Sequence, residues 1–224
     1  MIRPEIVARR IGSERQPIVI IDHFHPDPNF LITAATSTPF EPAHSHYPGV
    51  RAELPPNYFV QVRAPLVTAV IEAFGRGGAI DLIYAGFSMV TASPASLTIE
   101  QRLPHFDALQ PERIALVHYL SNDDRDGTAF FRHRSTGFET IDESRSAAYF
   151  KQLNGELSDT VLPEEYFHDS DPLFDRIENV EAQPNRAVIF RSASLHSGAI
   201  RPGARLDPDP ATGRLTVTAF LSVG

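Results

Sequence analysis

The clearest pattern in the chain is a helical one between residues 58 and 74. Apolar residues recur there at steps of three and four positions, at Tyr58, Val62, Leu66, Val70, Ile71 and Phe74. This spacing predicts a helix with one apolar face, and Gly75 stands where a residue able to adopt a left-handed conformation would end it. Pro65 lies inside the stretch, so we expect either a kink there or a helix that starts later.

Elsewhere the pattern is one of short extended segments separated by prolines and turn residues. Strands are expected at residues 17–22, 79–91, 97–102, 114–120, 128–133, 174–182, 186–191 and 214–223. A second helix is expected around residues 142–153, and residues 41–56, which contain four prolines, are expected to form an irregular loop. A helix followed by many short strands predicts a mainly β fold with flanking helices, built on a two-sheet, cupin-like jelly roll.

The composition limits the size and chemistry of this fold. The 224 residues, of which 42% are hydrophobic, suit one core, so we expect a single domain over residues 1–224. Residues 1–95 would form a supporting region of helix and strands, and residues 96–224 the jelly-roll core with any metal site. The sequence has no cysteine, so a metal would have to be bound by histidines and carboxylates.

Charge and hydropathy exclude two classes of partner. The formal net charge of −8 disfavours nucleic acid, because phosphate binding needs a basic surface. No apolar run approaches the roughly 20 residues that span a bilayer, and the first residues lack the layout of a secretory signal. We therefore expect a cytoplasmic protein that acts on a small-molecule or peptide substrate.

Candidate metal ligands occur in two places. His105-Phe106-Asp107 follows a predicted strand, and two side chains that are two residues apart in an extended segment point to the same side. Both could reach one ion at about 2.0–2.2 Å. His196 follows the strand expected at residues 186–191 and would complete a triad. Two imidazoles and one carboxylate on one face of an ion leave the opposite positions open, as in non-haem Fe(II) sites.

A His-x-Asp sequence alone is weak evidence, because this composition produces about one His-x-acid pair by chance. A second copy, His25-Pro26-Asp27, lies in a proline-rich turn, and we interpret it as the chance occurrence. The first copy is followed by an apolar strand that ends in Tyr119-Leu120-Ser121, by an acidic turn, and by Gly127-Thr128-Ala129-Phe130.

This order of motifs, with the distal His196 and an Arg-led last strand, resembles the prolyl-4-hydroxylase-type branch of the 2-oxoglutarate/Fe(II) oxygenases. The resemblance extends from about residue 97 to the C-terminus. It implies a double-stranded β-helix core, iron held by His105, Asp107 and His196, and 2-oxoglutarate and dioxygen as cosubstrates. The implied reaction hydroxylates an unactivated C–H bond of an amino acid, peptide side chain or small metabolite, with formation of succinate and CO2. Because related halogenases replace the carboxylate, Asp107 favours hydroxylation or desaturation.

The last predicted strand offers a site for 2-oxoglutarate. Its alternation places Arg214 and Thr216 on a polar side that we expect to line the interior of the barrel. A guanidinium can bind a carboxylate bidentately, and in the resembling family an arginine on this strand binds the distal carboxylate of 2-oxoglutarate. Arg205 and Arg201 are alternatives to Arg214, since they lie closer to the distal histidine in sequence. The Tyr119 hydroxyl, and after it the Thr216 hydroxyl, are further candidate contacts of the cosubstrate.

The substrate is not identified by any motif. Residues 42–51 and 140–172 are expected to form loops of the kind that cover active sites. Arg51 and Arg132 are candidate anchors for an acidic group of the substrate.

Two other functions remain open at this point. The chain could be a jelly-roll protein that binds or senses a metal or 2-oxoglutarate without turnover, because fold does not determine function. It could also be a cupin-like hydrolase or isomerase that uses Zn or Mn. In that case His44 and His46 would be ligands.

Overall fold

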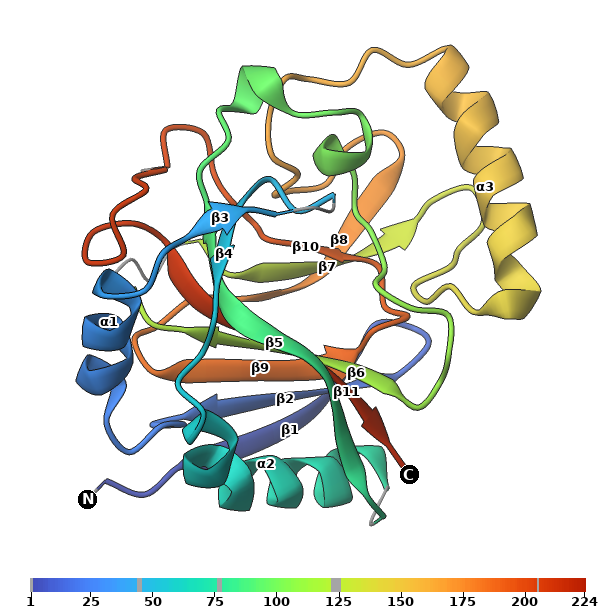
Figure 1. The fold of residues 1–224 in the computed structure, drawn as a ribbon. Helices are drawn as coiled ribbons and strands as arrows, with labels where there is room; N and C mark the ends of the chain where they lie inside the picture. The colour runs from blue at the N-terminus through green and yellow to red at the C-terminus, as the bar shows by residue number, and fades with distance from the viewer. Residues whose placement is uncertain (1, 44–45, 76–77, 122–125, 205) are drawn as a thin grey trace.

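Two antiparallel β-sheets carry most of the structure, a computed structural model that describes residues 2–43, 46–75, 78–121, 126–204 and 206–224. The larger sheet has eight strands in the order β1 (Glu5–Ile11), β2 (Gln16–Asp22), β9 (Arg186–Arg191), β6 (Arg113–Tyr119), β11 (Leu215–Val223), β5 (Ile80–Val90), β4 (Gly49–Ala52) and β3 (Glu41–Pro42). The smaller sheet has the order β10 (His196–Ser197), β7 (Thr128–His133) and β8 (Phe174–Val180). The chain is therefore mainly β, as predicted (Figure 1).

One face of the larger sheet is covered by α1 (Pro28–Thr36) and α2 (Tyr58–Phe74). The apolar stripe of α2 packs there against alternate residues of the central strands, among them Leu116 and Val217. Burial of this apolar area is the main term that holds the layer together. The alternation of the last strand is confirmed, since Leu215, Val217, Ala219, Leu221 and Val223 all belong to this core.

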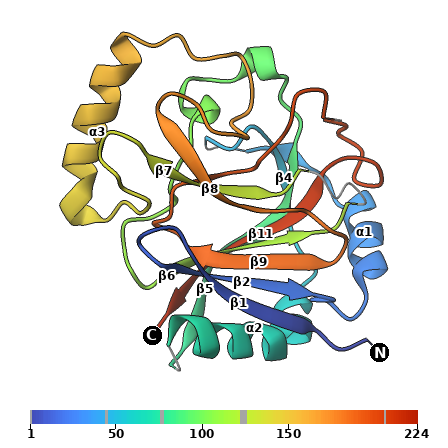
Figure 2. The same ribbon diagram turned by 180° about the vertical axis from the view of Figure 1, so that it is seen from behind.

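The opposite face of the larger sheet packs against the smaller sheet. Phe130 of β7 and Val180 of β8 share a core with Ile18, Val188 and Phe190 of the larger sheet. The far side of the smaller sheet is covered by α3 (Glu143–Ser158), so that the molecule is layered as helices, sheet, sheet and helix (Figures 1 and 2). The inner face of the larger sheet, between the two sheets, therefore carries the side chains of the polar side of β11.

The helical prediction for residues 58–74 is confirmed at both ends. Gly75 has a φ of 65°, and its N–H donates to the Ile71 carbonyl at 3.2 Å, which is the left-handed termination that glycine permits. Pro65 lies inside the continuous helix, where it forgoes one backbone hydrogen bond. The second predicted helix is α3, whose first N–H groups are capped by the Asp142 carboxylate.

The prediction of a strand at residues 97–102 is wrong. This segment instead contains η2 (Glu100–Arg102), a 3₁₀ turn preceded by another, η1 (Pro94–Ser96). Local hydrogen bonds explain the difference, because the Ser96 N–H donates to the Ser93 carbonyl at 2.9 Å and the Thr98 N–H to the Gln101 side chain at 3.0 Å. Such contacts replace the bonds that a strand would make with a neighbour.

Several helices and strands were not predicted. The exposed edge strand β1 has no apolar alternation to reveal it, and β3 and β4 lie in the proline-rich segment 41–56. Helix α1 begins directly after His25-Pro26-Asp27. Strands from both sides of residue 95 are neighbours at two places in the larger sheet, where β2 pairs with β9 and β5 pairs with β11. The expected supporting region thus contributes strands to the same sheet as the expected core.

Among the described residues, no helix has both the length and the apolar character that crossing a bilayer requires.

Candidate metal centre

Two segments that are distant in sequence meet beside the smaller sheet and carry the three predicted ligands. His105 and Asp107 lie in the segment between η2 and β6, and His196 begins β10. The His105 N–H donates to the His196 carbonyl at 2.9 Å, and the His196 N–H donates back at 2.8 Å. The Asp107 N–H donates to the Ser192 carbonyl at 2.7 Å. These backbone bonds fix the three ligand-bearing residues relative to one another.

The three side chains converge. The distance from His196 Nε2 to Asp107 Oδ2 is 3.6 Å, and that from His105 Nε2 to Asp107 Oδ1 is 3.9 Å. Candidate ligand atoms of all three residues lie within 4.8 Å of one another. Two ligands bound at right angles at 2.0–2.2 Å would be about 3 Å apart. Small side-chain rotations would therefore bring this group onto one ion.

The environment of His196 favours metal binding through one particular nitrogen. Its Nδ1 lies 2.9 Å from the Ser194 carbonyl oxygen, which can only accept a hydrogen bond. Nδ1 therefore carries the proton of the neutral ring, and the lone pair is on Nε2, the atom that faces Asp107. The Phe190 ring packs against the imidazole with centroids 4.6 Å apart. This partner arrangement is the one that orients histidines in metal sites.

The group is closed on one side and open on the other. The side chain of His196 is 9% exposed, whereas that of His105 is 53% exposed. A ligand could therefore approach from the His105 side.

The protein environment shifts the pKa of each of the three groups in the direction that favours its neutral form. Desolvation lowers the pKa of His105 to about 4, with a further decrease from the positive charge of His196. Desolvation also lowers the pKa of His196 to about 4. The pKa of Asp107 is raised to about 6 by desolvation, while the charges of His105 and Arg51 oppose this increase. Neutral imidazoles are the form that binds a metal.

Two of the predicted cosubstrate residues lie together at the end of the inner face. The Arg214 Nε and Nη2 groups donate to the carbonyls of Asp126 and Gly127, at 3.1 and 3.0 Å. The guanidinium carbon lies 6.0 Å from the ring centroid of Tyr119. The Tyr119 hydroxyl is buried and 2.6 Å from the Thr128 hydroxyl, and burial raises its pKa.

The third predicted contact, Thr216, is also on this inner face. Its hydroxyl donates to the Ser88 carbonyl at 3.1 Å, and it is a hydrogen-bond partner of the Tyr47 hydroxyl. Of the alternative arginines, Arg201 pairs with the Asp126 carboxylate at 3.1 Å. Arg205 lies outside the described residues.

Sequence reasoning missed Tyr47. Burial raises the pKa of its hydroxyl to about 12, and the positive charges of Arg214 and Arg51 oppose this increase. Arg51 itself contacts the rings of Tyr47 and Tyr84, at 4.8 and 4.9 Å from the centroids. No sequence motif marks either tyrosine, and their contacts with Arg51 are visible only in the folded structure.

The other candidate substrate anchor, Arg132, is bound elsewhere. Its guanidinium forms an ion pair with Glu139 at 2.6 Å, and the Glu139 carboxylate also accepts bonds from Ser13 and from the Glu14 N–H. These contacts attach the turn between β1 and β2 to the segment before α3. They are structural contacts that do not involve the three candidate ligands.

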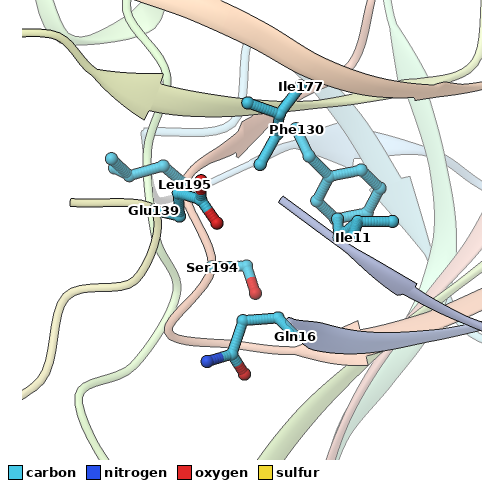
Figure 3. Close-up of a pocket in the computed structure, with 7 residues that line it drawn as sticks. All are labelled: Ile11, Gln16, Phe130, Glu139, Ile177, Ser194 and Leu195. Carbon is cyan, nitrogen blue, oxygen red and sulfur yellow. The ribbon is translucent and has the colours of Figure 1, made fainter. Parts of the chain in front are cut away.

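A small recess is lined by residues of β1, β2, β7 and β8 and of the segments before α3 and β10 (Figure 3). Its lining includes Ser194 and Leu195, which directly precede His196, but none of the three candidate ligands. The Ser194 hydroxyl is buried and has no hydrogen-bond partner within the described parts of the chain. We assign this recess to the support of the distal ligand.

The second His-x-Asp sequence is structural. The Asp27 carboxylate accepts the Phe30 N–H at 3.0 Å and so caps α1. His25 is buried, with Nε2 bonded to Gln61 at 2.8 Å and Nδ1 accepting the Asp27 N–H at 3.1 Å. For the cupin-like alternative, His44 lies outside the described residues, and His46 is exposed.

Comparison with known proteins places the chain in a family. No curated protein matches it at a significant level. A family model does match, over residues 2–221, which is nearly the whole chain. The chain belongs to DUF6445, a family of unknown function.

Proposed function

We propose that the protein is a non-haem Fe(II)- and 2-oxoglutarate-dependent oxygenase that hydroxylates an unactivated C–H bond of an amino acid, a peptide side chain or a small metabolite. The observation that carries the proposal is the convergence of His105, Asp107 and His196 to ligand distances. Two imidazoles and one carboxylate on one side of an ion are typical of non-haem Fe(II) oxygenases, since the remaining positions stay open for cosubstrates. The exposed edge of His105 supports this assignment.

The arrangement of the sheets supports the finer fold that this function needs. Two antiparallel sheets face each other, and the distal ligand begins a strand of the smaller one. We therefore propose that the core is a double-stranded β-helix of the jelly-roll type.

Arg214 is the residue that we propose for the distal carboxylate of 2-oxoglutarate. Its bonds to the carbonyls of Asp126 and Gly127 hold the guanidinium in one orientation, and its Nη1 makes no hydrogen bond within the described residues. A fixed guanidinium loses little entropy when it binds a carboxylate. Thr216, and Tyr119 beside the guanidinium, would complete the site.

The protein's part in the reaction is to hold and enclose the reactants. When bound, Fe(II), 2-oxoglutarate and dioxygen supply the oxidising chemistry, with release of succinate and CO2. Asp107 and the two histidines would hold the ion on one side, and the Ser194 carbonyl holds the proton of His196 on Nδ1. The rings of Phe130 and Phe190 exclude water from the buried side of His196.

The experiment is an assay of succinate formed from 2-oxoglutarate with Fe(II) and air, without added substrate. Oxygenases of this kind consume 2-oxoglutarate slowly in the absence of substrate, so we expect slow succinate formation that His196→Ala abolishes and the matched variant Asp27→Ala retains. A protein that binds both Fe(II) and 2-oxoglutarate but yields no succinate would instead be a binding or sensing protein.

A further inference from the structure

Arg51 has no role in the metal group or in the proposed cosubstrate site. It lies in β4 directly opposite Ser88 of β5, and Ser88 lies opposite Thr216 of β11. Residues that face each other across antiparallel strands project from the same side of a sheet. Arg51, Ser88 and Thr216 therefore share the inner face, on which the proposed 2-oxoglutarate contacts also lie.

The Arg51 guanidinium is held by aromatic rings and has no counter-ion among the described residues. It packs on the rings of Tyr47 and Tyr84, at 4.8 and 4.9 Å from their centroids, contacts that attract a cation. Its Nε is buried and has no hydrogen-bond partner among the residues that the structure describes. No carboxylate within the same residues forms an ion pair with it. A buried donor left without an acceptor destabilises the fold, and more so when it is charged.

A second donor without a partner lies beside it. Ser88 is fully buried, and its hydroxyl also makes no hydrogen bond within the described residues. Because Ser88 is the cross-strand neighbour of Arg51, two unsatisfied donors face the same space. Buried polar groups are nearly always hydrogen-bonded. This pair is consistent with an acceptor that binds from solution.

The position of this donor pair relates it to the metal group. The positive charge of Arg51 acts on Asp107, one of the three candidate ligands, and also on Tyr47. The positive charge of Arg214 acts on the Tyr47 hydroxyl as well. The inner face thus presents two separate cationic groups within electrostatic reach of the same tyrosine.

We propose that Arg51 and Ser88 bind a carboxylate of the primary substrate, which makes carboxylic acids, amino acids included, its substrate class. A planar guanidinium beside a hydroxyl suits a planar carboxylate, because the carboxylate accepts several hydrogen bonds at once. The identification of this ligand as a substrate rests on the proposed oxygenase function. The anion site itself rests only on the contacts of Arg51 and Ser88.

The test measures binding of a charged probe and its neutral analogue. Phenylacetate and phenylacetamide share one shape and differ in charge, and their ring suits a site bordered by tyrosines. Each is titrated by calorimetry, at constant ionic strength, into protein loaded anaerobically with Fe(II) and saturating 2-oxoglutarate. We expect the wild type to bind the acid at least ~10-fold more tightly than the amide, a difference of about 1.4 kcal/mol.

Four variants locate the preference for the acid. Arg51→Gln should remove it, Arg51→Lys should retain part of it, and Ser88→Ala should reduce it a few-fold. Arg132→Gln, which changes an arginine that is paired with Glu139, is the matched control and should retain it. The inference is overturned by equal or undetectable binding of acid and amide to the wild type. It is also overturned if Arg51→Gln, or Arg51→Lys should the glutamine variant not fold, binds the acid as the wild type does and so leaves the preference unchanged.

A further measurement distinguishes binding of the substrate by Arg51 from binding of the cosubstrate. Affinity for 2-oxoglutarate should be unchanged by Arg51→Gln and reduced by Arg214→Gln. Equal losses in the two variants would assign Arg51 to the cosubstrate and overturn the inference. If the protein does not bind 2-oxoglutarate at all, the oxygenase proposal fails. The comparison of acid and amide in metal-free protein then still decides whether Arg51 forms an anion site.

Discussion

The chain contains two His-x-Asp sequences, and the fold uses them in opposite ways. In His25-Pro26-Asp27 the carboxylate caps a helix and both ring nitrogens of the histidine have hydrogen-bond partners. In His105-Phe106-Asp107 the backbone is fixed by the distal segment, and both side chains face His196. The comparison teaches that a His-x-Asp motif can hold a metal only where a third ligand is brought to it and its donor atoms are left free for an ion.

The strongest way to break this comparison is to remove the carboxylate of the second pair. We expect Asp107→Ala to weaken Fe(II) binding by at least ~100-fold, because one of three protein ligands is lost, while the melting temperature changes little. Calorimetric titration with Fe(II) under argon measures the first effect and thermal unfolding the second. Unchanged Fe(II) affinity in this variant would remove Asp107 from the site.

The next largest effect is expected at Arg214, the residue proposed to bind 2-oxoglutarate. Arg214→Gln should weaken 2-oxoglutarate binding by about 10- to 100-fold, the loss expected for charge-assisted hydrogen bonds. Fe(II) affinity should stay as in the wild type, since Arg214 does not contact the three ligands within the described residues. Arg132→Gln is the control. If both variants bind 2-oxoglutarate normally, the assignment passes to Arg201 or Arg205.

His25 of the first pair belongs to a buried polar network. The contribution of this network to stability can be tested by its pH dependence. His118 is fully buried between the Tyr58 hydroxyl, at 3.1 Å, and the Asn185 side chain, at 3.0 Å. Asn185 in turn donates to the His25 carbonyl. Burial lowers the pKa of His118 to about 3.

The direction of the pH effect on folding stability follows from the protons that His118 binds in the folded and unfolded chain. The unfolded chain binds a proton at His118 below about pH 6.5, and the folded chain does not until about pH 3. The stability that His118 provides is therefore complete above pH 6.5 and decreases as the pH falls toward 3. At pH 5 the loss is about 2 kcal/mol. Denaturant unfolding of wild type and His118→Asn at pH 8 and pH 5 should show a smaller decrease in the variant, and equal decreases would contradict the assignment.

The smallest effect is expected at the carboxylate of the first pair. Asp27→Ala removes the cap of α1 and should lower the free energy of unfolding by about 1 kcal/mol. Fe(II) and 2-oxoglutarate binding should be unaffected. Together with Asp107→Ala this variant forms a matched pair, in which one carboxylate affects stability and the other affects metal binding. A loss of metal affinity in Asp27→Ala would contradict the distinction.

Much of the fold follows from local patterns in the sequence. The helix at residues 58–74 and the strand at residues 128–133 are found with their observed bounds, because each has a strong period and clear end signals. The segment 97–102 was misinterpreted because local capping bonds determine its conformation. The edge strand β1 was missed because its side chains are mostly exposed, so that no apolar pattern marks it.

The site could be predicted only where a motif names its residues. His105, Asp107 and His196 are recognisable from residue type and spacing, and the structure brings them together. Tyr47 and Ser88 were not found, because their roles depend on the pairing of β4, β5 and β11 and on the environment of Arg51. Arg132 was a candidate anchor for the substrate, and its ion pair with Glu139 could not be foreseen because that partner is seven residues away across a turn.

The most direct test of the metal centre is an anaerobic titration of the protein with Fe(II) and then 2-oxoglutarate, followed in the visible range. We predict binding of one Fe(II) per chain and a weak charge-transfer band once 2-oxoglutarate is added, with neither seen in Asp107→Ala. Failure to bind Fe(II), or Fe(II) binding without the band, would contradict the assignment of His105, Asp107 and His196 as the iron site of a 2-oxoglutarate-dependent oxygenase.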